Sequence, residues 1–125
     1  LRWDGKTCEM VGVIPADTVM HPRPVGRGYI RLRETGTNQW PETEAGAEFN
    51  GHEFHYSSLD NIDPDLTFAY ELVRGKGVTG HHDGIVYKNL LANYAHLRDV
   101  GDCHWTRRFV AFVRAQKGTQ MDAIT

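Results

Sequence analysis

The chain has 125 residues, of which 40% are hydrophobic and 24% are charged, and its formal net charge is −2 at pH 7. This length is typical of one domain. No run of Lys and Arg indicates a nucleic-acid partner, and no apolar stretch approaches the roughly 18 residues of a membrane-spanning helix. Cys8 and Cys103 show no CxxC spacing, which favours free thiols in the cytoplasm over a disulfide framework.

The opening of the chain is polar. It begins with Leu1 rather than Met and continues through Arg2 to Lys6 without the apolar h-region of a signal peptide. Such an opening is typical of a connection between domains. We therefore expect a domain cut from a longer polypeptide, and the alternative is a small standalone protein.

The first half of the chain is predicted to be rich in strands. The β-branched run over 9–14 predicts a buried strand that ends at Pro15. Two prolines exclude a helix over 21–25. Apolar and polar residues alternate over 28–33, which predicts a half-buried strand. The polar stretch 34–50 predicts a solvent-facing loop.

The second half continues with short strands and ends in one helix. Strands are predicted over 51–58, 67–73 and 85–87, and turns at 60–65, 75–77 and Asp83-Gly84. Residues 88–97 fit either a further strand or a short helix. Aromatic residues at helical spacing predict a helix over 104–117 that Gly118 ends. Residues 1–118 then form the domain, and 119–125 a flexible tail.

Residues 51–57 concentrate two imidazoles, a carboxylate, a phenol and a hydroxyl. Successive side chains of a strand face opposite sides. One face would hold His52, Phe54 and Tyr56, and the other Glu53, His55 and Ser57. The second set could form a hydrogen-bonded polar cluster. The two histidines are three residues apart on opposite faces, unlike the helical zinc-protease motif, so we predict no metal site.

Other candidate side chains carry less information. His81 and His82 lie beside a predicted turn, where solvated imidazoles are expected. His96 is a candidate general base, although a hydrogen-bonded core histidine is the alternative. Neither Cys8 nor Cys103 has the small-residue elbow that exposes a nucleophile. The chain thus offers a base without a credible nucleophile.

Two segments resemble a known family. Gly51–Ser57 closely resembles the signature of the cobyrinic acid a,c-diamide synthases, which are the corrin-amidating members of the class I glutamine amidotransferases. Ala92–Leu97 resembles the late Ala-Ser-Tyr-x-His-Leu segment of that family, and 10–15, 27–29 and 105–113 resemble three other segments. The resemblance covers nearly the whole chain. It implies an α/β fold that is part of a three-layer αβα amidotransferase domain, strand-rich with a C-terminal helix.

The resemblance also implies a division of labour. In such enzymes an N-terminal domain uses ATP and magnesium to activate a tetrapyrrole carboxylate, and a C-terminal domain hydrolyses glutamine to supply ammonia. The nucleophilic Cys lies upstream of the residues matched here, and its activating base corresponds to His96. Five further residues are expected near the active site, namely Glu53, His55, Tyr56, Ser57 and Tyr94. No cofactor is expected within this chain.

The resemblance leaves the substrate open. The family often continues His-Leu-His, whereas this chain has His96-Leu97-Arg98, and similar relatives are thought to amidate sirohaem. We expect an amidoligase that uses glutamine and a tetrapyrrole carboxylate; the alternative is a non-catalytic module that binds a tetrapyrrole or a protein. We expect this chain alone to lack glutaminase activity. We also expect a homodimer, because part of a sheet would leave strand edges and apolar surface exposed; a monodisperse monomer in light scattering would contradict that.

Overall fold

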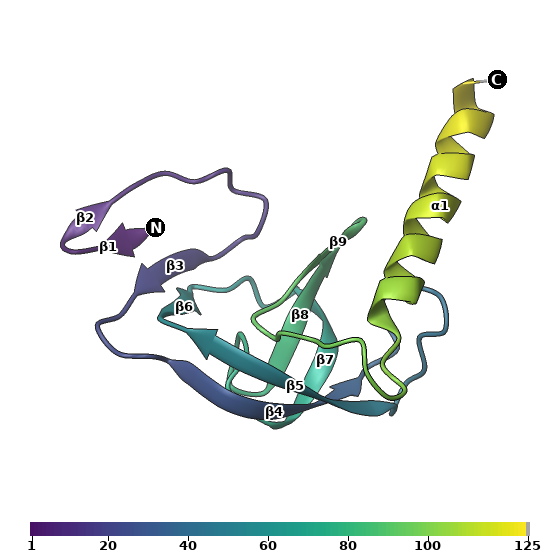
Figure 1. Ribbon diagram of the computed structural model, residues 1–125. Coiled ribbons are helices and arrows are strands. Elements are labelled where there is room, and N and C mark those ends of the chain that lie inside the picture. Colours follow the sequence, from purple (N-terminus) through teal and green to yellow (C-terminus); the bar gives the residue numbers. More distant parts are fainter. Residues whose placement is uncertain (125) are drawn as a thin grey trace.

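The chain folds into two sheets and one helix, seen in a computed structural model that describes the backbone of residues 1–124 and the side chains of 1–118 (Figure 1). The elements are β1 (Arg2–Trp3), β2 (Lys6–Thr7), β3 (Asp17–Met20), β4 (Gly26–Glu34), β5 (Glu48–His55), β6 (Ser57–Asp60), β7 (Thr67–Arg74), β8 (His82–Tyr87), β9 (Leu90–Ala92) and α1 (Trp105–Ile124). The predicted strand-rich α/β class with a C-terminal helix is confirmed.

The strands divide unequally between the sheets. The smaller sheet has the order β2-β1-β3-β6, and its β1 and β3 are parallel. The larger sheet has the order β5-β4-β7-β8-β9, with all neighbours antiparallel. In Figure 1 the β1–β3 unit and α1 stand at opposite ends of the molecule. The described residues contain one helix, so a three-layer arrangement is not visible within them.

The two edges of the larger sheet are linked to each other. After β9 the chain returns to β5, where His52 and His96 form an isolated antiparallel bridge through backbone hydrogen bonds of 3.0 and 2.6 Å. The sheet therefore encloses one core. Its buried members are Ile30, Leu32, Ala69, Tyr70 and Ala95.

Several predictions for individual segments are confirmed. The strands expected over 28–33, 67–73 and 85–87 lie within β4, β7 and β8. The alternation in β4 is as predicted, because Ile30 and Leu32 are buried whereas Tyr29 is 78% exposed. Residues 21–25 are not helical.

The predicted buried strand over 9–14 is wrong. This segment is an unpaired loop in which Val11 is 93% exposed. A φ of +79° at Gly12 interrupts the extended backbone that a strand requires. The loop encloses an open hollow of about 720 Å³ together with β3, so its apolar side chains lack the cover that a buried strand would have.

The predicted strand over 51–58 is divided between both sheets. β5 begins earlier, at Glu48, so the loop predicted over 34–50 ends at Ala47. β5 ends at His55, and β6 begins at Ser57 in the smaller sheet. The chain changes sheets at Tyr56, and no local sequence signal marks this tertiary pairing.

The tight turn predicted at Asp83-Gly84 is also wrong, because both residues lie inside β8. Gly84 has a φ of +73°, and a Cβ there would lie 2.6 Å from the Tyr70 ring. The glycine is needed for this close approach of backbone and aromatic ring. Asp83 and Gly84 are thus part of a packed strand here and do not form a hairpin turn.

The structure decides between the alternatives for residues 88–97 and tests the predicted helix. Residues 88–97 contain the short strand β9 and no helix. The predicted helix is present, but α1 continues through Gly118 to Ile124, so a helix end at Gly118 is wrong. The flexibility predicted for 119–125 stays a prediction, and Thr125 lies outside the described residues. No helix of the described chain is long and apolar enough to cross a membrane.

A buried ion pair fastens α1 to the larger sheet. Arg108 of α1 donates to the Glu34 carboxylate of β4 at 2.8 Å, and both side chains are nearly inaccessible. The same guanidinium donates to the Pro41 carbonyl at 2.9 Å and to the Thr43 hydroxyl at 2.9 Å. These bonds satisfy a charge that burial would otherwise make very costly.

Replacement of Arg108 by Leu should destabilise the fold by about 3–5 kcal/mol, because it leaves the Glu34 carboxylate buried without its partner. The matched control is Arg107→Leu. Arg107 pairs with Glu42 at 2.6 Å on the surface, and such exposed pairs contribute less than about 1 kcal/mol. Urea unfolding of both variants measures the difference. Equal losses of unfolding free energy would contradict the anchoring role.

Candidate functional site

The two faces of β5 carry two separate groups of polar side chains. Glu53 and His55 point into the core and are buried, whereas His52 and Phe54 point outward. The alternation predicted for this strand is therefore confirmed. The inner and outer groups therefore have different environments.

The Glu53 carboxylate lies at the centre of the inner group and is 2% exposed. Its two oxygens accept the backbone N–H groups of Lys76 and Gly77 at 2.8 and 2.9 Å. Burial raises the pKa of Glu53, but these bonds and the neighbouring His55 outweigh it, so the pKa lies below its ordinary value. The carboxylate thereby holds the turn after β7.

His55 forms a buried pair with Glu53. Its Nδ1 lies 2.9 Å from the Ser57 carbonyl and its Nε2 lies 3.2 Å from a Glu53 oxygen. A carbonyl only accepts, and so does an ionised carboxylate. Nδ1 therefore donates to the Ser57 carbonyl, and Nε2 lies beside the Glu53 carboxylate. Gly26 makes room for this pair, because a Cβ there would lie 2.3 Å from Nε2.

Tyr94 connects this pair to the segment that carries His96. Its ring stacks on His55 with centroids 3.8 Å apart, and its hydroxyl lies 2.7 Å from the Ser57 hydroxyl. Burial raises the pKa of the Tyr94 phenol. The predicted polar cluster is therefore present, and Ser57 joins it through Tyr94 and its own carbonyl.

Asp83 fixes the backbone just before His96. It is 0% exposed, and its oxygens accept the N–H groups of Tyr94 and Ala95 at 3.0 and 2.8 Å. Burial raises the pKa of Asp83, and these hydrogen bonds counteract the rise only in part. Sequence reasoning missed this residue because Asp-Gly was assigned to a turn. An acidic residue just before the apolar run of 85–87 was the available signal.

The outer group is a row of three exposed rings. His96 lies with its ring centroid 6.0 Å from that of His52, and the His52 centroid lies 5.9 Å from that of Tyr29. Ala95 is buried and Leu97 packs on the core, so the His96 side chain points away from the interior. Among the described residues its imidazole makes no side-chain hydrogen bond.

The structure therefore brings together four of the predicted site residues and separates them from the proposed base. Glu53, His55, Ser57 and Tyr94 form the inner cluster, whereas Tyr56 faces outward beside Phe54, with ring centroids 5.5 Å apart. His96 lies on the outer face. The inner cluster can position the base through the backbone, but it presents no group directly to the imidazole.

The two cysteine thiols lie in different environments. Cys8 is exposed and Cys103 is buried, and burial raises the pKa of the Cys103 thiol, which disfavours the reactive thiolate. The described residues contain no group of three or more His, Cys, Asp or Glu side chains placed to hold a metal ion. Among the described residues, no thiol or hydroxyl is hydrogen-bonded to the His96 imidazole.

Comparison with known families identifies the chain. Residues 2–99 match the CobB/CobQ-like glutamine amidotransferase domain. The chain belongs to this family. The resemblance carried by Gly51–Ser57 and Ala92–Leu97 is therefore confirmed, and both segments of this amidotransferase-family chain lie within the match.

Individual relatives agree with the family assignment. The cobyrinate a,c-diamide synthase of Magnetococcus marinus is 41% identical over 114 residues, which cover 91% of this chain and 24% of that protein. The enzyme of the same name from Halobacterium salinarum is 42% identical over 94 residues, covering 75% of this chain and 21% of that protein. The chain thus spans about a quarter of its relatives' length. No solved structure matches it.

Replacement of Asp83 by Asn should loosen the segment before His96, because the amide offers one acceptor and presents a donor to the second N–H group. Leaving a buried N–H unsatisfied costs about 1–3 kcal/mol. We expect hydrogen exchange of the His96 amide to accelerate at least about tenfold. Asp102→Asn, at an exposed position, is the control. Unchanged exchange in the Asp83 variant would contradict the positioning role.

Glu53 should contribute to the acid sensitivity of the fold. Because its pKa is lowered on folding, its stabilisation is present above its unfolded pKa of about 4.3 and is lost as the pH falls through the folded pKa. The free energy of unfolding of Glu53→Gln should therefore fall less steeply than that of the parent below about pH 4.5. Glu9→Gln, at an exposed site, should match the parent slope; the same slope in both variants would count against this role.

Proposed function

We propose that the chain forms the C-terminal part of the amidotransferase domain of an ATP-dependent amidoligase that acts on the a and c carboxylates of a tetrapyrrole. The match of residues 2–99 to the amidotransferase family carries this proposal, and relatives named cobyrinate a,c-diamide synthase support the substrate. Sirohaem is the alternative acceptor. The three-layer αβα arrangement is proposed for the complete domain.

His96 is the proposed general base of the glutaminase reaction. The backbone that carries its exposed imidazole is held by the bridge to His52 and, two residues and one residue earlier, by the Asp83 bonds. It would remove the proton of a cysteine thiol outside this chain. The thiolate then attacks the amide carbon of glutamine, forms a glutamyl thioester and releases ammonia, and water later hydrolyses the thioester. Backbone N–H groups near that cysteine would stabilise the oxyanion.

Activation of the acceptor carboxylate is assigned to other parts of the enzyme. ATP with magnesium would convert the tetrapyrrole carboxylate into an acyl phosphate, which the released ammonia attacks. We assign no residue of this chain to binding ATP or magnesium. A cytoplasmic location is proposed because both cysteines are free, as is usual in reducing compartments.

Self-association of the chain is a further element of the proposal. Its support is the exposed apolar loop after β2, where Met10 is 63% and Val11 is 93% exposed. Contiguous exposed apolar patches are enriched at interaction sites. A second copy or another segment of the same polypeptide would cover it.

The mass of the native polypeptide tests the function, and an antibody against this domain can detect it in extracts of the source cells. A band several times heavier than 14.2 kDa is expected, since the relatives are about four times longer. In that polypeptide His96→Ala should lower glutamine hydrolysis by about 10²–10⁴-fold. His81→Ala, at an exposed turn, is the control.

The chain of 125 residues alone should not hydrolyse glutamine above buffer. Hydrolysis by the chain alone that His96→Ala abolishes would show that the nucleophile lies within it, against this proposal. A native band at the mass of the chain would instead favour the non-catalytic binding module.

A further inference from the structure

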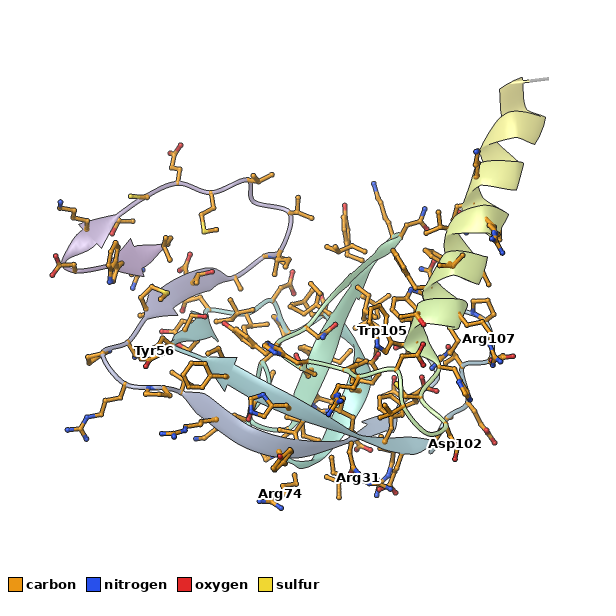
Figure 2. All side chains as sticks on the ribbon, viewed as in Figure 1. Arg31, Tyr56, Arg74, Asp102, Trp105 and Arg107 are labelled. Atoms are coloured by element: carbon orange, nitrogen blue, oxygen red, sulfur yellow. The ribbon has the colours of Figure 1, made fainter. Side chains whose placement is uncertain are left out.

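A cationic hollow lies on the outer face of the larger sheet, on the same side as His96. It has a volume of about 420 Å³ and is lined by Tyr29, Ile30, Arg31, Asn50 and Arg74. Figure 2 shows Arg31 and Arg74 on this outer side of β4 and β7. Neither the family match nor the proposed base accounts for this hollow.

A β-bulge brings the two arginines together. Leu32 pairs with Leu72, but the next pair is Arg31 with Arg74, because the register shifts between Arg31 and Leu32. Without that shift, Arg74 would share the inward side of Leu72, since a slip of one residue reverses the face of every side chain. Bulges re-aim side chains in this way beside functional sites. The result is a cross-strand pair of two arginines on the outer face, and like charges at such a pair are destabilising.

The neighbouring carboxylates do not neutralise the hollow. Glu48 is shared between Arg31 at 3.2 Å and Arg33 at 3.4 Å, and Glu71 pairs with Arg33 at 3.6 Å. Among the described residues, the Arg74 side chain makes neither an ion pair nor a hydrogen bond. One guanidinium is therefore left with its donors unused.

The polar groups that line the hollow are mainly donors. Arg31 donates one N–H to the Asn50 carbonyl oxygen at 2.9 Å, which leaves the Asn50 amide NH₂ and a further guanidinium nitrogen of Arg31 available. Arg74 adds its planar fork, and Tyr29 adds a phenol and an exposed ring. A carboxylate accepts about four hydrogen bonds and fits the arginine fork with two of them.

We propose that this hollow binds a carboxylate group of a small organic ligand on the His96 face of the sheet. Resting on the proposed function, the ligand is the polycarboxylate compound that receives the ammonia. Glutamine fits less well, because its single carboxylate lies next to an ammonium group that cationic side chains repel. A compound with several carboxylates and no ammonium group matches the donors of Arg31 and Arg74.

Calorimetric titration of the protein, as its source produces it, with benzene-1,3,5-tricarboxylate tests the site. The neutral benzene-1,3,5-tricarboxamide is the matched control ligand, and it should bind at least about tenfold more weakly, because charge-assisted hydrogen bonds are about twice as strong as neutral ones. Arg74→Gln should weaken tricarboxylate binding about tenfold. Arg114→Gln, on an exposed part of α1, removes the same charge elsewhere and should change the affinity less than about twofold.

Equal weakening by Arg74→Gln and Arg114→Gln would show a general charge effect and overturn the site. Equal binding of the tricarboxamide, or no binding of the tricarboxylate at 10-fold the protein concentration and above, would also overturn it. Tight binding of an acidic peptide without tricarboxylate binding would replace the proposed ligand by a protein partner. His96→Ala should leave tricarboxylate binding intact, so failure of the glutaminase proposal and failure of this site give different results.

Discussion

The backbone bridge between His52 and His96 is the contact on which the larger sheet depends. It joins the segment after β9 to β5, the opposite edge of that sheet, and so gives a lean core an enclosed interior. Antiparallel pairing alone would leave both edges open to other strands. The bridge also determines chemistry, because it fixes the backbone of His96 while the alternation of side chains turns the imidazole outward. Closure of the fold and placement of the candidate base therefore have the same cause.

Buried carboxyl groups specify this closure in addition to apolar packing. Five core residues form the buried hydrophobic cluster, whereas three carboxylates, Glu34, Glu53 and Asp83, are 3%, 2% and 0% exposed. Each accepts backbone N–H groups or an arginine, and each joins segments distant in sequence. Groups of this kind add little net stability when paired, but they disfavour alternative arrangements in which they would be unpaired. Here they specify how three loops and α1 meet the sheet.

The sequence predicted local structure well wherever periodicity and burial agreed. The alternation of β4 and the faces of β5 were correct because a half-buried strand imposes a period of two. The sequence-based prediction failed where a residue contacts a partner that is distant in the sequence. Asp83-Gly84 resembled a turn, yet the aspartate accepts Tyr94 and Ala95 N–H groups and the glycine clears the Tyr70 ring. The apolar run over 9–14 resembled a buried strand, yet nothing among the described residues pairs with it.

The candidate site shows the same division between local and tertiary information. The residue types of 51–57 indicated a polar cluster and a base, and the structure assembles that cluster. Only the fold shows that the cluster and His96 lie on opposite faces of β5, so that Glu53 and His55 make no contact with the candidate base. The outer face then joins His96, through His52 and Tyr29, to the hollow between Arg31 and Arg74. The inner face of β5 holds the backbone in position, and its outer face is the one on which we propose that substrates bind.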